Sequence, residues 1–149
     1  MWPFTRRRGT PPDDPQSLGQ RGEKLAARFL RRLKYKPLAT NYRCPAGEAD
    51  LIVLDTSTRR ETGYETIVFV EVKTRRDAGN VSPQAHVNAA KQRTLRRIAR
   101  YYLATHDARD FAVRIDIVAV LVPQETEPNL THVKHLINAV PFSFARRQK

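Results

Sequence analysis

Two apolar runs within the stretch Gly47–Arg75 decide the fold of this chain, and they read Glu48-Ala49-Asp50-Leu51-Ile52-Val53-Leu54 and Ile67-Val68-Phe69-Val70-Glu71-Val72-Lys73. Both are rich in β-branched and aromatic residues, which is typical of β-strands. Because side chains alternate between the two faces of a strand, Glu71 and Lys73 share one face of the second run. If the two strands are neighbours in register, Asp50, Glu71 and Lys73 meet at one end of an apolar sheet.

The expected meeting of two carboxylates and an ammonium group has two interpretations. Close carboxylates repel each other, so one takes up a proton or a cation lies between them. Mg²⁺ suits such a pair because it binds through one or two protein carboxylates and keeps waters, and it could activate a water to attack a phosphodiester. The alternative is an ordinary ion pair of Lys73 with Glu71 or Asp50, which contributes little to stability. Spacing alone leaves both open.

The composition indicates an anionic partner. The 149 residues include 27 Lys and Arg against 15 Asp and Glu, which gives a net charge of +12. A chain of this length forms one domain with a substantial core. Its excess of positive charge predicts binding to nucleic acid or to an anionic membrane surface.

Other features of the sequence narrow the class of protein. Cys44 is the one cysteine, which excludes an intramolecular disulfide and a Cys-based zinc cluster. No stretch approaches the ~20 apolar residues of a transmembrane helix. The first eight residues are partly basic but lack a following apolar segment, so they do not resemble a secretory signal. We therefore expect a cytoplasmic protein. Glu23 on the inner face of the first helix and the use of Arg throughout argue against a membrane-surface partner.

The periodicity of apolar residues predicts five strands and two long helices. We expect a disordered arm over 1–19, a folded domain over 20–139 and a basic tail over 140–149. The expected elements are a helix from about Ser17 or Gly22 to Lys34, strands at Leu38–Arg43 and from Glu48, a polar loop at Thr56–Thr66, the strand from Ile67, a helix from Pro83 (capped by Ser82) to about His106, and strands at Phe111–Val122 and Leu130–Ile137. The first three strands form an antiparallel meander.

Charged residues also lie on helix faces where apolar residues are expected. Glu23 is in line with Ala26 and Leu30, so it points toward the sheet, either beside the other acids or simply as an acid in a first helical turn. Lys91 lies in the apolar stripe of the second long helix. The other arginines of that helix are expected at the surface, where they either bind phosphates or remain solvated with their stems covering apolar neighbours.

Several of these runs resemble the YraN-type (UPF0102-like) family of small bacterial proteins. The matching runs are Gly22-Glu23-x-x-Ala26, Asn41-x-Arg43, Gly47-Glu48-Ala49-Asp50-Leu51-Ile52, Val68-Phe69-Val70-Glu71-Val72-Lys73-Thr74-Arg75, Lys91 and Arg114-Ile115-Asp116-Ile117-Val118. That family is similar to archaeal Holliday junction resolvases and so to the PD-(D/E)XK nuclease superfamily. The resemblance implies a restriction-endonuclease-like α/β fold, in which a central mixed five-stranded sheet with an antiparallel meander is flanked by helices.

The resemblance also implies roles for individual residues. Asp50 and Glu71 would bind Mg²⁺ (or Mn²⁺), Lys73 would be the catalytic lysine, and Glu23 would match a glutamate of the first helix in the resolvases. Ala49 departs from the superfamily pattern, which has proline before the aspartate. We further expect a nucleic-acid-binding set made of Arg43, Arg75, Gln84, Lys91, Arg93 and Arg97.

The sequence therefore predicts a metal-dependent endonuclease that hydrolyses phosphodiester bonds in DNA, with branched DNA as a candidate substrate. Cleavage of a junction would require two active sites and hence a homodimer with twofold symmetry. The competing hypothesis is a non-catalytic nucleic-acid-binding protein on a nuclease-like scaffold, since the charge alone explains binding.

Overall fold

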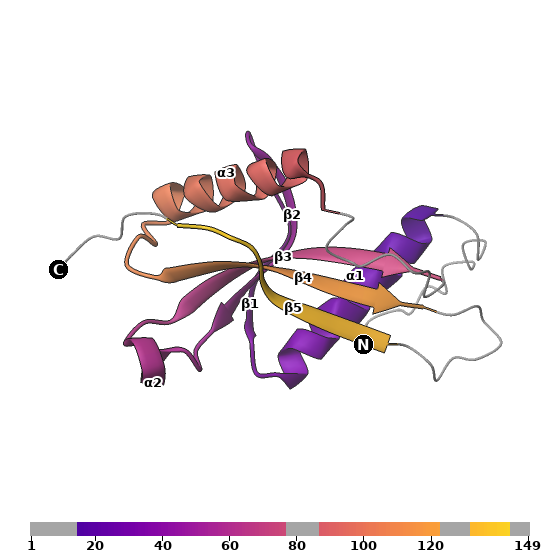
Figure 1. Cartoon of the computed structure of the whole chain (residues 1–149), viewed down its shortest axis with the longest axis horizontal. Coiled ribbons are helices and arrows are strands. Elements are labelled where there is room, and N and C mark those ends of the chain that lie inside the picture. Colours follow the sequence, from indigo (N-terminus) through magenta and orange to yellow (C-terminus); the bar gives the residue numbers. More distant parts are fainter. Residues whose placement is uncertain (1–14, 77–86, 123–131, 144–149) are drawn as a thin grey trace, which may run out of the picture.

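A five-stranded mixed sheet forms the centre of the computed structural model, which describes residues 15–76, 87–122 and 132–143 (Figure 1). The strands are β1 (Lys36–Cys44), β2 (Gly47–Asp55), β3 (Thr66–Arg75), β4 (Ala112–Leu121) and β5 (His132–Val140), and they lie in chain order across the sheet. The pairs β1–β2, β2–β3 and β4–β5 are antiparallel, whereas β3 and β4 are parallel. The predicted α/β fold with its antiparallel meander is confirmed.

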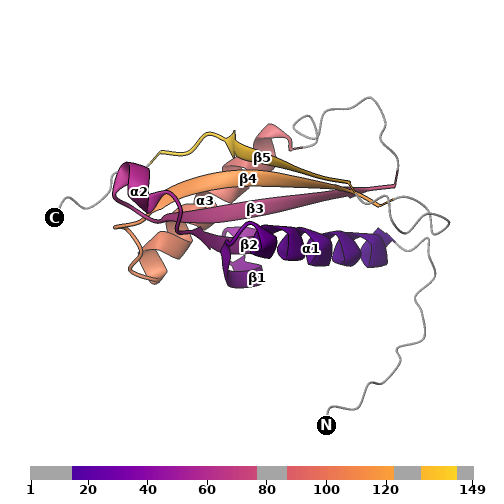
Figure 2. The same cartoon turned by 90° about the horizontal axis from the view of Figure 1, so that it is seen from below.

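Two long helices cover opposite faces of the sheet (Figure 1). α1 (Pro15–Arg32) packs through Ala26 and Leu30 against one apolar cluster, which includes alternate residues of β3. α3 (Ala89–Thr105) packs through Leu95 and Ile98 against the other. Figure 2 shows α1 in front of the sheet and α3 behind it. A single helical turn, α2 (Arg59–Thr62), lies in the predicted loop between β2 and β3.

The parallel pairing of β3 with β4 follows from the long connection between them. A parallel neighbour requires a crossover, and α3 supplies it. The alternation of side chains in β3 then divides the core. Ile67 and Phe69 face α3, whereas Val68 and Val70 face α1.

The ends of the helices differ from the sequence prediction. α1 begins at Pro15 and ends at Arg32, and Leu33 beyond it is 49% exposed, so Leu33 does not belong to the buried stripe. α3 begins at Ala89, because the side chain of Asn88 accepts a hydrogen bond from the Lys91 N–H at 2.8 Å and caps the helix there. The predicted cap Ser82 lies outside the described residues.

The C-terminal strand is also displaced from its expected position. β5 runs to Val140, which is fully buried, rather than ending at Ile137. Phe142, in the segment predicted as a basic tail, packs against the α3 side of the core. None of the helices in the described ranges is long and apolar enough to cross a membrane.

Candidate active site

The structure brings Asp50 and Glu71 together where β2 diverges from β3. Backbone pairing between these strands ends at Leu51 and Val70. Immediately beyond it, the Asp50 carboxylate takes the place of a strand partner, since its Oδ2 accepts a hydrogen bond from the Val72 N–H at 2.7 Å. The Asp50 side chain therefore pairs with the β3 backbone in place of a β2 backbone group. This hydrogen bond holds Asp50 at the point where the two strands separate.

Glu71 lies next to the point where β2 and β3 separate, and it is only 5% exposed. Its Oε1 is 3.2 Å from the Lys73 Nζ, and its Oε2 is 3.3 Å from the Lys91 Nζ. Among the described residues, Oε2 nevertheless has no hydrogen-bond partner. A buried carboxylate oxygen that lacks a hydrogen bond is costly in free energy, so this oxygen is suited to a further cationic ligand.

Lys91 reaches the same place from α3, in addition to the groups expected there from the sequence. Its Nζ also donates to the backbone carbonyl of Glu48 at 3.4 Å. The close approach of the β1–β2 turn to α3 allows this contact. Gly47 has φ of +141°, and a Cβ at this position would lie 2.7 Å from the Thr94 methyl group. We refer to Asp50, Glu71, Lys73 and Lys91, together with Glu23, as the acidic site.

The electrostatics of the acidic site disfavour full ionisation of its carboxylates. Burial, and then the neighbouring charge of Glu71, raises the pKa of Asp50 to about 7, against the opposing hydrogen bond from Val72. Burial also raises the pKa of Glu23, with the charges of Glu48 and Glu71 adding to the effect. Negative charge is thus concentrated here beyond what the two lysines neutralise.

Glu23 reaches the acidic site because α1 lies very close to β3. A Cβ added to Gly22 would overlap the Thr74 side chain, so only glycine allows this approach. The Asn41 side chain of β1 forms a hydrogen bond with Glu23 and lowers its pKa against the larger effect of burial. Glu23 therefore approaches the acidic site from the face of the sheet opposite to α3, beside Asn41 of β1.

The donor set of the acidic site fits a hard divalent cation. Mg²⁺ binds through one or two carboxylates and completes its shell with water and phosphate oxygens, which matches Asp50 and Glu71. The buried Oε2 of Glu71, which has an ion-pair contact with Lys91 but no hydrogen bond, is the observation that supports this fit. Within residues 15–76, 87–122 and 132–143, no group of three or more His, Cys, Asp or Glu side chains is placed to hold a metal. A cation at the acidic site would therefore have at most two carboxylate ligands from the described residues.

The residues predicted to bind nucleic acid are dispersed. Arg43 is exposed and its Nε lies 3.1 Å from the Glu48 carboxylate. Arg75, Arg93 and Arg97 are exposed at the end of β3 and along α3. Lys91 lies in the acidic site rather than on the outer surface, and Gln84 lies outside the described residues.

A second charged cluster lies at the other end of β2, and its sequence signal was visible in the run Arg114-Ile115-Asp116. The Arg114 guanidinium donates to both oxygens of Asp116 at 2.8 and 3.0 Å, to Asp55 at 3.2 Å and to the Tyr35 hydroxyl at 3.0 Å. The His135 Nε2 lies 2.7 Å from the same Asp116 carboxylate. We refer to these five residues as the arginine network.

Comparison with known proteins places this geometry in a family. The chain matches the profile of "Uncharacterised protein family UPF0102" over residues 22–120. It is 38% identical over 127 residues to a UPF0102 protein of Geotalea daltonii, covering 85% of this chain and 94% of that one.

A UPF0102 protein of Nocardia farcinica is 41% identical over 121 residues, covering 81% of this chain and 89% of that one. A UPF0102 protein of Mycobacterium avium is 41% identical over 117 residues, covering 78% and 87% of the two chains. The chain belongs to the UPF0102 family. The matched region of this UPF0102 protein runs from Gly22, at the close contact of α1 with β3, to Val120 in β4, and so includes every residue of the acidic site.

Proposed function

We propose that this UPF0102 protein is a metal-dependent endonuclease that hydrolyses phosphodiester bonds in DNA, with branched DNA as the candidate substrate. The observation that supports it is the meeting of Asp50, Glu71 and Lys73 where β2 leaves β3, with one Glu71 oxygen left without a hydrogen bond. A divalent cation would offset the burial and the neighbouring charge of Glu71 that together raise the pKa of Asp50.

Each residue of the acidic site has a part in the proposed reaction. Asp50 and Glu71 would hold Mg²⁺ or Mn²⁺, which when bound polarises the phosphodiester and lowers the pKa of a water. Lys73, whose Nζ is 3.2 Å from Glu71, would orient that water or neutralise the charge that develops on the phosphate. Lys91 would contact an adjacent phosphate oxygen, since it already lies beside Glu71.

The competing proposal is a protein that binds nucleic acid without cleaving it. The net charge of +12 supports this proposal and requires no chemistry at the acidic site. The two proposals differ in one measurable respect, because only the first requires a divalent cation and the ionised carboxylates.

A cleavage assay separates them. The substrates are fluorescently labelled four-way junction, splayed duplex and linear duplex DNA, incubated with Mg²⁺, Mn²⁺ or EDTA. We expect metal-dependent cleavage by the wild type and a loss of at least about 100-fold in rate for Asp50→Asn and Lys73→Met, because each change removes a group that acts on the transition state.

The matched control is Asp110→Asn, which neutralises an exposed aspartate far along the chain. This variant is expected to cleave at the wild-type rate. DNA binding by the wild type without cleavage of any substrate in either metal would refute the endonuclease and favour the non-catalytic protein.

A further inference from the structure

A cleft of about 500 Å³ lies between α1 and β1, directly beside the acidic site. Lys24, Arg28 and Arg31 line it from α1, and Thr40 and Asn41 line it from β1. The pattern of α1 predicts that the three basic side chains face open solvent. In the structure they are exposed but line a concave surface, so they can contact one ligand together.

The three basic side chains form a row suited to an extended anion. Their spacing of four and then three residues places them on one side of α1 over ~10 Å. None of them forms an ion pair with another described residue, whereas Arg43 and Arg114 do. Cations without counter-ions along a cleft raise the local concentration of anionic ligands.

One end of the cleft adjoins the acidic site. Glu23 and Leu51 belong to its lining, and Leu51 directly follows Asp50 in β2. The charge of Glu23 also contributes to the raised pKa of Asp50, so Glu23 acts electrostatically on the acidic site from the lining of the cleft. An anion held along the basic row would therefore extend toward Asp50.

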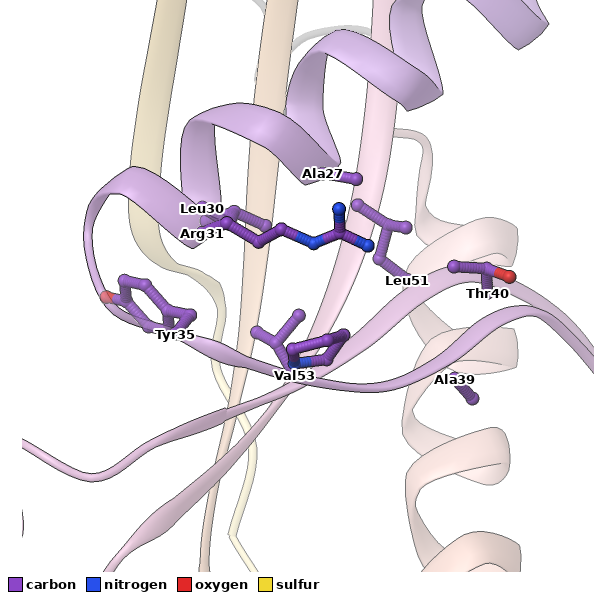
Figure 3. A pocket seen from close by; sticks show the side chains of 9 residues that line it. Ala27, Leu30, Arg31, Tyr35, Ala39, Thr40, Leu51 and Val53 are labelled. Carbon is purple, nitrogen blue, oxygen red and sulfur yellow. The ribbon is translucent and has the colours of Figure 1, made fainter. Parts of the chain in front are cut away.

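The size of the cleft favours one strand over a duplex. Its volume lies in the range of ~300–1,000 Å³ that holds a small-molecule ligand. A duplex, whose major groove alone is ~12 Å wide, is too large to enter a cleft of that size. The cleft also adjoins a pocket of about 20 Å³ that shares Ala27, Arg31, Thr40 and Leu51 with it (Figure 3). Figure 3 shows Arg31 extending from α1 over this pocket toward Leu51.

The chemistry of the lining selects the backbone of the strand rather than its bases. Grooves that read single strands by stacking present aromatic side chains. The side chains that line this cleft are basic, amide, hydroxyl and aliphatic, and Glu23 is the acid at the end near Asp50. Arg and Lys beside Thr and Asn are the groups that contact phosphates and sugars in protein–DNA complexes.

We propose that the cleft binds the sugar–phosphate backbone of a single DNA strand, so that the substrate is DNA with a single-stranded arm beside the bond to be cleaved. This inference rests on the proposed endonuclease function for the position of the cleaved bond, whereas binding of the strand requires no catalysis. Asn41 holds Glu23 at the junction of cleft and acidic site.

The test measures binding in EDTA, where cleavage cannot interfere. Fluorescence anisotropy of a labelled single-stranded oligonucleotide and of its duplex is followed for the wild type and the double variant Arg28→Ala/Arg31→Ala. We expect the double variant to bind the single strand about tenfold more weakly, with the slope of log K against log salt reduced by ~1.4, since ~0.7 is lost for each phosphate contact with a single strand. Duplex binding is expected to change by less than about threefold.

Two controls make the result specific to the cleft. Arg21→Ala/Arg32→Ala removes the same charge from exposed positions of α1 that do not line the cleft, and should leave single-strand affinity within about threefold of the wild type. Arg28→Lys/Arg31→Lys keeps the charge and should retain most of the affinity. Equal losses for both alanine pairs, or equal losses for single strand and duplex, would overturn the proposal.

A cleavage arm with Mg²⁺ distinguishes failure of this inference from failure of the endonuclease. Wild-type cleavage of splayed duplex that is unchanged in Arg28→Ala/Arg31→Ala would overturn the cleft and leave the endonuclease standing. A selective loss of single-strand binding in that variant, with no cleavage by the wild type, would support the cleft and refute the endonuclease.

Discussion

The acidic site and the arginine network lie at opposite ends of β2, and they differ in how fully their carboxylates are hydrogen-bonded. In the arginine network, both oxygens of Asp116 accept two partners each, from Arg114, His135 and the backbone N–H of Asn138. In the acidic site, Glu71 keeps a buried oxygen without a hydrogen bond. Asp50 and Asp55, five residues apart on β2, belong to the two different clusters and can be compared directly.

The pKa values of those two aspartates move in opposite directions. Burial and the charge of Glu71 raise the pKa of Asp50 to about 7. Burial acts to raise the pKa of Asp55 too, but hydrogen bonds from the Ser57 side chain and backbone, and then Arg114, outweigh it, so that pKa lies below its usual value. A cluster whose polar groups are all satisfied stabilises the fold, whereas an unsatisfied one is available to a ligand.

The largest expected effect is on the arginine network. Arg114→Met removes the guanidinium and leaves Asp116, which is fully buried, with only His135 and the Asn138 N–H as partners. We expect a loss of ~3–5 kcal/mol in the free energy of unfolding, because breaking a buried pair from one side strands the other charge. Urea denaturation measures it, and Arg109→Met, at an exposed position, should change stability by less than ~0.5 kcal/mol. A loss below ~1 kcal/mol for Arg114→Met would show that the network is not structural.

A smaller effect is expected where α1 approaches the acidic site. Gly22→Ala places a Cβ on the Thr74 side chain and pushes α1 away from β3, which should cost ~1–3 kcal/mol of unfolding free energy and displace Glu23. Gly19→Ala is the matched control, since a Cβ there meets nothing within 4 Å. It should be neutral or stabilising by up to ~1 kcal/mol through helix propensity. Equal stability of the two variants would contradict the close contact.

The smallest expected effect is a pH dependence of stability with opposite signs at the two aspartates. Because the pKa of Asp50 is raised from 3.8 to about 7 by folding, the native state holds a proton that the unfolded state releases, and stability falls as the pH rises from about 4 through 7. Asp50→Asn keeps an acceptor for the Val72 N–H but cannot ionise. Its unfolding free energy relative to the wild type should therefore rise by about 1 kcal/mol between pH 5 and 8 in EDTA, a figure already reduced for solvent screening.

Asp55→Asn is expected to change the pH dependence of stability in the opposite direction to Asp50→Asn. The pKa of Asp55 is lowered, so its contribution is present above its usual value of 3.8 and is lost as the pH falls through the native pKa. The variant should be less stable than the wild type at neutral pH and converge with it in acid. Urea unfolding at a series of pH values measures both variants, and the same trend in the two would remove the distinction between the clusters.

Local pattern was sufficient for much of the fold because strand and helix periods are short-range properties. The alternation in β3 predicted which residues face each side, and the charges at Asp50, Glu71 and Lys73 were visible as interruptions of apolar runs. The start of α3 was not predictable from local pattern. Ser82 was predicted as the cap but Asn88 caps the helix, and which polar residue caps a helix depends on what the helix packs against.

The sequence by itself determined the strands, their order in an antiparallel meander and the identity of three groups that meet at the acidic site. Only the tertiary structure decided that Lys91 joins them, that Arg114 satisfies Asp55 and Asp116 together, and that the basic row of α1 borders a cleft with β1. These are contacts between segments far apart in the chain, and their existence depends on how closely helices approach the sheet, as at Gly22 and Gly47, which no local periodicity records.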